Sequence, residues 1–274
     1  MDAGLNLDFS EDELHRYGRH ILLDEVGAIG QARLREARVL VVGAGGLGSP
    51  LVLYLAAAGV GTIGIADPDV VELSNLQRQV AHTTARIGAR KTASAATAAA
   101  AINPLVRLVT HDVRVDAARV NALIAPYDIV CDGTDNFATR FLLADACHLA
   151  AKTLVSAAVL RFEGQLATFK PGTPCYRCLY PESPPDGLVP ACGDAGVLGS
   201  VTGVMGTLQA TAVLKEILRI GQSLAGRLLL WDALATRFRT VTLRHDPACI
   251  LCGPHATLHD MSHHHSASES ACVL

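Results

Sequence analysis

The sequence contains no long run of basic residues and no strong excess of either charge. Its formal net charge is −3 over 274 residues, which argues against a nucleic-acid partner and against an anionic membrane surface. Half of the residues are apolar, yet no stretch reaches the roughly 18 uninterrupted apolar residues of a membrane span. The first residues are acidic and lack the basic start of a secretory signal. We therefore expect a cytoplasmic protein with neither a membrane nor a nucleic-acid partner.

No internal repeat is visible, and the length fits one large α/β domain or two small ones. The chain does contain eight cysteines. In a cytoplasmic protein they indicate metal binding or catalysis before disulfides, because that compartment keeps thiols reduced.

A glycine-rich turn in the first half of the chain has the context of a nucleotide-binding loop. An apolar run at 39–42, long enough for a buried strand, leads into it, and a helical pattern follows over 47–58. The turn carries a G-x-G-x-x-G fingerprint, formed by Gly43, Gly45, Gly46 and Gly48. Glycines let the backbone approach phosphate oxygens, and the helix start adds partial positive charge.

An acidic residue follows at the distance that this fingerprint requires. Asp67 ends the next predicted strand, 62–66, about 20 residues beyond the last glycine. There its carboxylate can accept hydrogen bonds from ribose hydroxyls. The loop and Asp67 together predict a nucleotide ligand without saying which nucleotide. A tight turn with no ligand is the alternative.

More polar residues follow the predicted strands, where ligand contacts cluster in doubly wound sheets. They are Asp69, Ser74, Asn75, Arg78, Lys91, Asp135 and Asn136. Lys91 lies near the start of a helix reaching to 102, where it can face phosphates or be a plain surface lysine. Asp135 follows the predicted strand 128–132 and is placed for a Mg²⁺ ion on nucleotide phosphates. An N-cap for the helix 137–151 is the alternative, and Asn136 can take that role.

The N-terminal segment begins with a capping box, Ser10 with Glu13, that opens a helix. Arg16 and Arg19 lie three residues apart and therefore share one face of it. This face is either solvated or part of an arm that reaches a phosphate.

The pattern changes from residue 153 onward. Two strands joined by a turn are predicted within 155–169, a buried helix over 196–220, and strands at 227–231 and 238–243. After His255 the chain becomes polar, and we expect residues 255–274 to form a disordered tail. Its three consecutive histidines are interpreted as solvated, with a weak metal site as the alternative.

Two C-x-x-C pairs lie far apart in this second half. Each pair can hold one metal ion through a short turn, and together they complete a closed tetrahedral site for structural zinc, with the ligands Cys175, Cys178, Cys249 and Cys252. Free thiols or a redox pair are the alternatives. Cys192 differs, because it lies in a glycine- and proline-rich loop just before a helix. That position can activate a thiol for covalent chemistry, and an incidental loop cysteine is the alternative.

In this order, the motifs over residues 10–254 closely resemble the ThiF/MoeB/HesA group of ubiquitin-activating-like adenylyltransferases. The resemblance rests on Arg16 to Arg19, the glycine loop, Asp67 with Asp69, Ser74 to Arg78, Lys91, Thr134 to Asn136 and the two cysteine pairs. It implies a Rossmann-like doubly wound α/β sheet continued by antiparallel strands into one mixed sheet, with a Cys₄ zinc site. The expected domains are a helical arm at 1–30, an adenylation domain at 31–254 and the tail at 255–274. Within that domain, 31–152 would bind nucleotide, and 153–254 would bind the carrier and zinc.

In this group the enzyme uses Mg-ATP to adenylate the C-terminal glycine of a small β-grasp sulfur carrier, MoaD- or ThiS-like, that ends in Gly-Gly. Pyrophosphate leaves, and the carrier is primed to form a thiocarboxylate. The resemblance implies that Asp67 holds the ribose, Gly46 lies against the nucleotide and Asp135 binds Mg²⁺. Phosphate contacts would come from Asn75, Arg78 and Lys91. Arg19 would reach into the partner's site across a homodimer interface.

Cys192 aligns with a position that forms a covalent link to the carrier in some members and is dispensable in others. The sequence shows no C-terminal rhodanese-like domain, which some relatives carry, so sulfur is expected from elsewhere. The carrier's pathway stays open among molybdopterin, thiamine, tRNA thiolation and secondary metabolism. Two rival interpretations are an NAD-dependent oxidoreductase, which leaves Arg78, Lys91 and Asp135 unexplained, and a non-catalytic binder of a ubiquitin-like protein.

Overall fold

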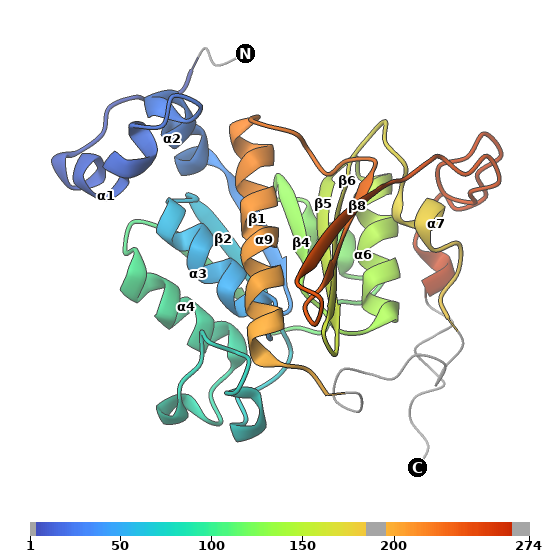
Figure 1. Cartoon of the computed structure of the whole chain (residues 1–274), viewed down its shortest axis with the longest axis horizontal. Helices are drawn as coiled ribbons and strands as arrows, with labels where there is room; N and C mark the ends of the chain where they lie inside the picture. Colours follow the sequence, from blue (N-terminus) through green and yellow to red (C-terminus); the bar gives the residue numbers. More distant parts are fainter. Residues whose placement is uncertain (1–3, 185–195, 265–274) are drawn as a thin grey trace.

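Eight strands form one continuous sheet in the computed structural model, which describes residues 4–184 and 196–264 (Figure 1). The strand order is β3-β2-β1-β4-β5-β6-β7-β8. The parallel part consists of β1 (Arg38–Val42), β2 (Thr62–Ala66), β3 (Arg107–His111), β4 (Ile129–Asp132) and β5 (Thr153–Leu160). The antiparallel part consists of β6 (Glu163–Phe169), β7 (Arg227–Asp232) and β8 (Arg237–Thr242). The predicted fold, a doubly wound sheet continued into one mixed sheet, is confirmed.

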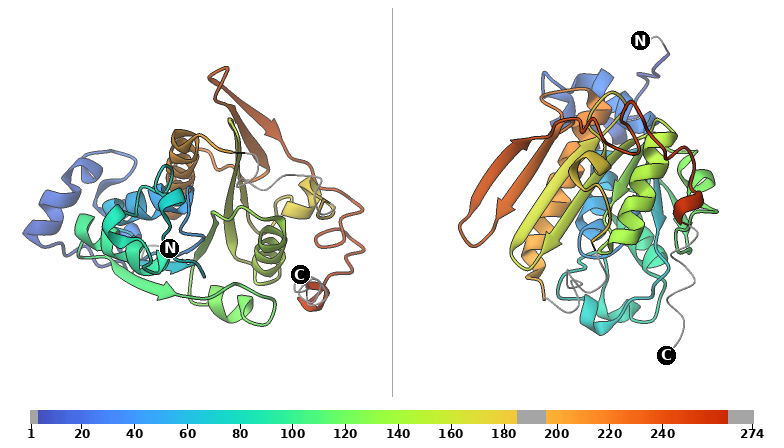
Figure 2. Two further views of the ribbon diagram at one scale, coloured as in Figure 1. Left: turned by 90° about the horizontal axis from the view of Figure 1, so that it is seen from below. Right: turned by 90° about the vertical axis from the view of Figure 1, so that its right-hand side faces the viewer.

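Helices pack on both faces of the parallel part, as Figures 1 and 2 show from three sides. One face carries α2 (Gly27–Glu36), α3 (Gly48–Ala58), α4 (Lys91–Ile102) and α9 (Gly199–Leu218). The other face carries α5 (Val120–Ile124) and α6 (Phe137–Leu149). None of the described helices is both long and apolar enough to cross a membrane.

The apolar run of β1 follows from this two-sided cover. Val39 and Val41 belong to the core cluster on one face of the sheet, and Leu40 and Val42 belong to the cluster on the other face. Successive side chains of a strand point to opposite faces, so a strand that is covered on both sides needs apolar residues at every position. β8 differs, because all six of its residues are exposed at the edge of the sheet.

The N-terminal arm begins with α1 (Glu11–Ile21), and its predicted capping box is confirmed. The Ser10 side chain accepts from the Glu13 N–H, and the Glu13 carboxylate accepts from the Ser10 N–H. No sequence pattern predicted α2, which has no side-chain cap among the described residues. The expected boundary between residues 30 and 31 falls inside α2, where Gln31 and Leu34 are buried.

Short elements complete the chain: α7 (Tyr176–Leu179) and the 3₁₀ turns η1 (Leu73–Asn75), η2 (Thr84–Arg86) and η3 (Ser262–His264). The disorder expected from residue 255 is wrong for 255–264, which the structure places against the body of the protein. The physical reason is burial, because Met261 is 5% exposed and packs in the core cluster beside α6. Residues 265–274 lie outside the described part of the chain.

The sheet topology determines where a ligand can bind. The strand order reverses between β1 and β4, which are direct neighbours although two strands separate them in the sequence. At such a switch point the loops after neighbouring parallel strands diverge and leave a crevice at their carboxyl ends.

Candidate functional site

A cavity of about 710 Å³ lies at the carboxyl ends of the parallel strands. Most of its lining comes from the loops that follow β1, β2, β3 and β4, and α4, α6, α9 and β5 contribute further residues. Ten residues that the sequence singled out line it: Gly43, Gly45, Gly46, Asp67, Asp69, Asn75, Arg78, Lys91, Asp135 and Asn136. The fold therefore gathers in one cavity residues that are spread over more than 90 positions of the chain.

The glycine loop can approach a ligand closely because side chains are missing where the backbone is crowded. Gly43 has φ +92°, and a Cβ placed on it would lie 2.8 Å from the carbonyl oxygen of Gly133. At Gly45 a Cβ would meet only the Gln79 amide, at 3.6 Å among the described atoms. α3 then starts without a side-chain cap in the part of the chain that the structure describes. Its first N–H groups and the helix dipole therefore suit an anion.

Gly43→Ala tests this crowding. The methyl group would clash with Gly133 and force a left-handed backbone on alanine, so we expect the free energy of unfolding to fall by about 1–3 kcal/mol. Gly18→Ala in α1 is the matched control, since a Cβ there meets no described atom within 4 Å and should be neutral or slightly stabilising. Urea unfolding of both variants checks the prediction, which equal stabilities would contradict.

Asp67 holds the glycine loop in place. One carboxylate oxygen accepts from the Ala44 N–H at 2.8 Å and the other accepts from the Asp69 N–H at 2.9 Å. Each oxygen keeps a further lone pair, and Asp67 borders the cavity. The carboxylate can therefore accept ribose hydroxyls while it fixes the loop.

Lys91 is the first residue of α4, and its side chain is 9% exposed. Its ammonium lies 2.9 Å from an oxygen of Asp69, whose side chain is 56% exposed. Because Asp69 is largely solvated, this ion pair holds the lysine only weakly. The pair positions the ammonium at the cavity and leaves it able to contact phosphate oxygens.

The loop after β2 folds back on itself before it reaches the cavity. The Asn75 side chain accepts from the Glu72 N–H at 3.1 Å, and Arg78 donates to the Ser74 carbonyl at 3.0 Å. Asn75 and Arg78 line the cavity, whereas Ser74 is not among the described residues that do so. The backbone carbonyl of Ser74, and not its hydroxyl, therefore helps to orient the arginine.

Asp135 and Asn136 divide the two roles considered for them. The Asn136 side chain accepts from the Thr139 N–H at 2.9 Å and so caps α6. Asp135 is exposed and borders the cavity, where its carboxylate is available to a cation. Behind them Asp132 is fully buried and accepts from the Thr134 N–H and hydroxyl and from the Ser156 hydroxyl. These bonds fix the loop that carries Asp135.

Three arginines that line the cavity were not predicted from the sequence: Arg90, Arg114 and Arg140. Arg114 follows β3, so its position after a predicted parallel strand was a usable signal. Arg140 is buried one turn into α6, where it donates to the Thr134 carbonyl and lies 3.9 Å from Asp132. A single arginine inside an apolar helix pattern gives no such signal. The extra positive charge makes the cavity more suitable for a polyanion.

His82 supports the glycine loop from behind. Its Nε2 lies 2.9 Å from the Ala44 carbonyl, which can only accept, so Nε2 carries the proton. Its Nδ1 lies 2.9 Å from the Ser94 hydroxyl in α4. Burial lowers the pKa of His82 below its ordinary value of 6.5. The neutral imidazole therefore links the glycine loop to the helix that begins with Lys91.

This burial predicts a pH dependence of stability. Burial also lowers the pKa of His111 and His148. As the pH falls through about 6.5, the unfolded chain takes up protons that the folded chain resists. The free energy of unfolding is therefore expected to fall from pH 7.5 to 5.5, as urea unfolding would show. The loss should be smaller in His82→Gln, whose amide still donates to Ala44 but does not titrate; a stability that rises on acidification would contradict the prediction.

The two C-x-x-C pairs meet as predicted. Their four sulfur atoms lie within 4.8 Å of one another, with separations of 3.5 Å for Cys175–Cys249 and 3.3 Å for Cys178–Cys252. A tetrahedral Cys₄ zinc site has sulfur atoms about 3.8 Å apart, so a small expansion admits the ion. Burial raises the pKa of Cys252 to about 11, which keeps this thiol protonated unless a cation binds. The cluster connects the segment before α7 to the segment after β8.

Besides Ser74, one more predicted residue of the described part of the chain does not line this cavity. Arg19 is exposed on α1 and is not among the described residues that line it. Cys192 lies outside the described residues, so its role stays a prediction.

The sequence is similar to those of known proteins. The ThiF family model matches residues 17–251. The chain belongs to the ThiF family. It is 50% identical over 244 residues to a Mycobacterium tuberculosis protein named probable adenylyltransferase/sulfurtransferase MoeZ, covering 87% of the chain and 62% of MoeZ. The chain thus spans less than two thirds of that relative's length.

Two other relatives match over most of their own length. The SAMP-activating enzyme E1 of Haloferax volcanii is 48% identical, over 91% of this chain and 92% of that protein. The sulfur carrier protein adenylyltransferase of Thermus thermophilus is 47% identical, over 92% and 96%. Among solved structures, Escherichia coli MccB with ATP has a TM-score of 0.77 at 21% identity, covering 86% of this chain and 74% of that one. That likeness supports the fold alone.

Proposed function

We propose that this ThiF-family protein is an adenylyltransferase that uses ATP to adenylate the C-terminal glycine of a small β-grasp sulfur carrier, MoaD- or ThiS-like, and releases pyrophosphate. The names of the relatives from Haloferax and Thermus support this activity. The observation that carries the proposal is the cavity, where the glycine loop and Asp67 lie beside Lys91, Arg78 and Asp135. A dehydrogenase would need the glycine loop and Asp67, but it would not need the charged side chains of Lys91, Arg78 and Asp135.

The side chains at the cavity suit this reaction. A carboxylate that attacks the α-phosphate brings two anions together, so positive charge at the cavity lowers the barrier electrostatically. In the proposal Lys91 and Arg78 supply this charge, and Asp67 orients the ribose. The attacking carboxylate of the carrier is already ionised at neutral pH, so the protein needs no general base.

Two metals belong to the proposal, and the residues fit both. Mg²⁺ at Asp135 would neutralise phosphate charge, since an exposed carboxylate at the cavity suits a hard cation. Zn²⁺ would be held by the four cysteines, whose closed shell has only thiol ligands and therefore suits a structural ion. In this role the zinc ties the C-terminal segment to the segment before α7.

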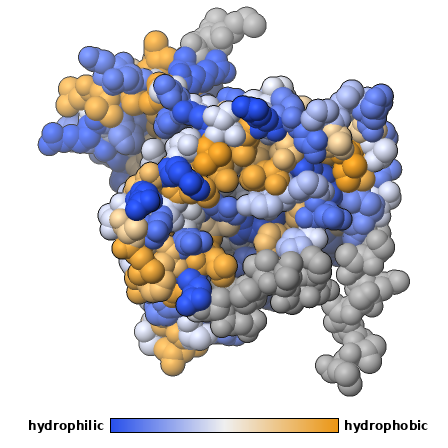
Figure 3. Space-filling view, turned by 45° about the vertical axis from the view of Figure 1, so that its right-hand side comes forward, coloured by the Kyte–Doolittle hydropathy of each residue, from blue (hydrophilic) through white to orange (hydrophobic). Residues whose placement is uncertain are grey.

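We extend the proposal to a homodimer in which Arg19 reaches the partner's cavity. The N-terminal arm, at the upper left of Figure 3, shows apolar surface among polar atoms. Its exposed large apolar side chains are Leu7, Leu14, Leu22, Leu23 and Ile29. An arm with this surface suits burial against a second copy. Arg19 lies on the same arm and is exposed.

Mixing two inactive variants tests this arrangement. Arg19→Ala and Asp135→Ala are each expected to lose exchange activity. If the arginine acts in the partner's cavity, mixed dimers contain one intact site, and an equimolar re-equilibrated mixture should regain about a quarter of the wild-type activity. A mixture that stays as inactive as its components would contradict the shared site.

The proposed activity is tested by ATP–pyrophosphate exchange with a panel of purified β-grasp proteins that end in Gly-Gly. Exchange that depends on one carrier and disappears in Asp135→Ala would support adenylation and identify the carrier. ATP binding without exchange for any carrier would favour the non-catalytic binder. Preferential binding of NADH would favour the oxidoreductase.

A further inference from the structure

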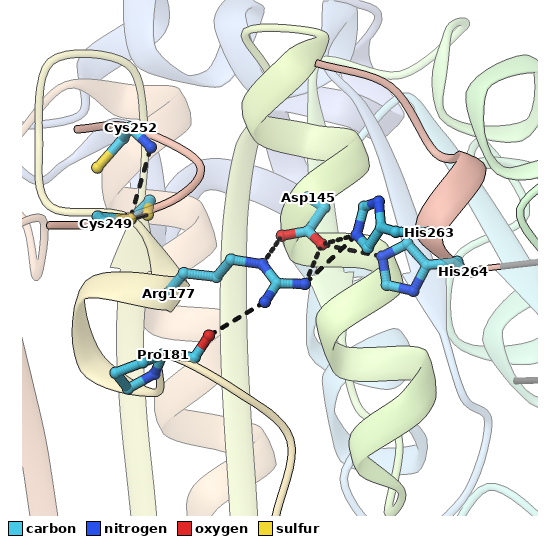
Figure 4. Close-up of polar contacts among 8 residues, drawn as sticks. Asp145, Arg177, Pro181, Cys249, Cys252, His263 and His264 are labelled. Atoms are coloured by element: carbon cyan, nitrogen blue, oxygen red, sulfur yellow. Dashed lines mark hydrogen bonds and ion pairs between the residues drawn. The ribbon is translucent and has the colours of Figure 1, made fainter. Parts of the chain in front are cut away.

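A second group of metal-binding side chains is absent from the described lining of the nucleotide cavity and shares no ligand with the cysteine cluster, although Arg177, between Cys175 and Cys178, contacts it. Asp145 of α6 is fully buried, and the C-terminal segment brings His263 and His264 of η3 against it (Figure 4). One ligand atom from each of the three residues lies within 4.8 Å of the others. His263 and His264, which were expected to be solvated, thus face a buried carboxylate.

Oδ2 of Asp145 has more nitrogen neighbours within hydrogen-bond distance than it has lone pairs to accept them. Oδ2 of Asp145 lies 3.0 Å from Nε2 of His263 and 2.9 Å from Nε2 of His264. The same oxygen accepts from Nη2 of Arg177 at 2.7 Å. Three donors would therefore compete for an oxygen that has two lone pairs. A cation bound by Oδ2 and by unprotonated imidazole nitrogens removes this conflict.

Arg177 gives further evidence on the protonation of His263. Its Nη2, which can only donate, lies 3.4 Å from Nε2 of His263. A proton on that Nε2 would place two donors face to face. The contact therefore favours an Nε2 that offers its lone pair, which is the form that binds a metal ion.

The surrounding structure fixes both sides of the group. Arg177 holds the Asp145 carboxylate through two bonds, with Nε donating to Oδ1 at 2.8 Å and Nη2 donating to Oδ2. The charge of Arg177, whose Nη2 lies 2.7 Å from Oδ2, favours the ionised form of the Asp145 carboxylate. Met261 anchors the histidine segment independently by packing in the core. Such support for ligand side chains is typical of protein metal sites.

We propose that Asp145, His263 and His264 form a second metal site that binds a divalent first-row transition ion, with Zn²⁺ as the probe. Two imidazoles and one carboxylate are a ligand set that such ions accept, whereas Mg²⁺ and Ca²⁺ prefer oxygen ligands. The charge of Arg177 offsets that of Asp145, so the ion binds more weakly here than at the cysteines. This site is independent of the proposed adenylation.

The test counts zinc ions per chain after equilibrium dialysis of the zinc-loaded protein against buffered Zn²⁺. Wild type is expected to take up one ion beyond the ion at the cysteines. His264→Ala and Asp145→Asn should lower the affinity for the second ion by about tenfold or more. His259→Ala, an exposed histidine on the same segment, should leave it unchanged.

Three outcomes would overturn the proposal: no second ion in wild type, equal binding by Asp145→Asn, or an equal loss in His259→Ala. If Asp145→Asn does not fold, a synthetic peptide of residues 255–274 replaces it. A peptide that binds Zn²⁺ as tightly as the whole chain would assign the binding to the histidines alone. A peptide that binds about tenfold or more weakly would support the site.

Discussion

Lys91→Met is expected to slow carrier-dependent ATP–pyrophosphate exchange by about 100- to 1,000-fold. The substitution keeps most of the apolar stem of Lys91 and removes the positive charge at the cavity. Lys91 is the first residue of α4. Its ammonium lies 2.9 Å from Asp69, and its side chain is largely shielded from water. In such a site an electrostatic contact with phosphate is worth more than in water. We expect the fold to persist, because the exposed Asp69 loses little when its partner is removed.

A matched control separates this effect from a general loss of charge. Lys215 lies in α9, donates to the Gln222 carbonyl and is not among the described residues that line the cavity. Lys215→Met should retain exchange within about threefold of wild type, a change typical of a surface substitution. The measurement is initial-rate exchange at saturating ATP, with thermal unfolding recorded for both variants. Equal rates for the two variants, with both folded, would remove Lys91 from the proposed site.

Cys249→Ser is expected to release the metal from the cysteine cluster and to lower the free energy of unfolding by about 4–5 kcal/mol or more. Cys249 is 4% exposed, and its sulfur lies 3.5 Å from that of Cys175. Losing one of four ligands leaves the buried Cys175 and the partly buried Cys178 and Cys252 without the cation that would balance their thiolates. The segment after β8 then loses its connection to α7.

Cys147→Ala is the control for this prediction. Cys147 belongs to α6 and is buried in the core, and burial raises its pKa to about 12, so this thiol stays protonated and is not a ready metal ligand. Its loss should cost about 1–2 kcal/mol through the small cavity that remains. Metal analysis and urea unfolding of both variants decide the matter. A Cys249→Ser protein that keeps its zinc and its stability would contradict a structural role.

The glycine loop is an element that local sequence patterns alone predict. An apolar run, a glycine turn and a helical pattern lie within residues 39–58, and each is governed by contacts between near neighbours in the chain. Asp67, Lys91 and Asp135 were found because each follows a predicted parallel strand or starts the next helix. All carboxyl ends of a parallel sheet meet at one edge, so topology alone brings such residues together. The spacing of the cysteine pairs predicted their meeting in the same way, because each pair forms a complete half of a metal site.

Local sequence patterns did not predict the position of Arg140 or the group around Asp145. Arg140 is an isolated charge in an apolar helix pattern, and its position at the cavity depends on how α6 packs against the loop after β4. His263 and Asp145 are 118 residues apart, and neither neighbourhood contains a motif that refers to the other. The polar segment after residue 255 predicted disorder, and the burial of one side chain, Met261, reversed that outcome for residues 255–264.

The sequence by itself therefore determined the sheet, the glycine loop, most of the charged residues at the cavity and the pairing of the cysteines in one cluster. Periodicity, turn chemistry and the short spacing of ligands are local properties, and a parallel sheet converts them into a common site. The tertiary structure alone decided which arginines complete the cavity, how His82 supports the glycine loop and where the C-terminal histidines lie. Those contacts join residues that are distant in the chain, and only the packing of helices on the sheet sets the distances between them.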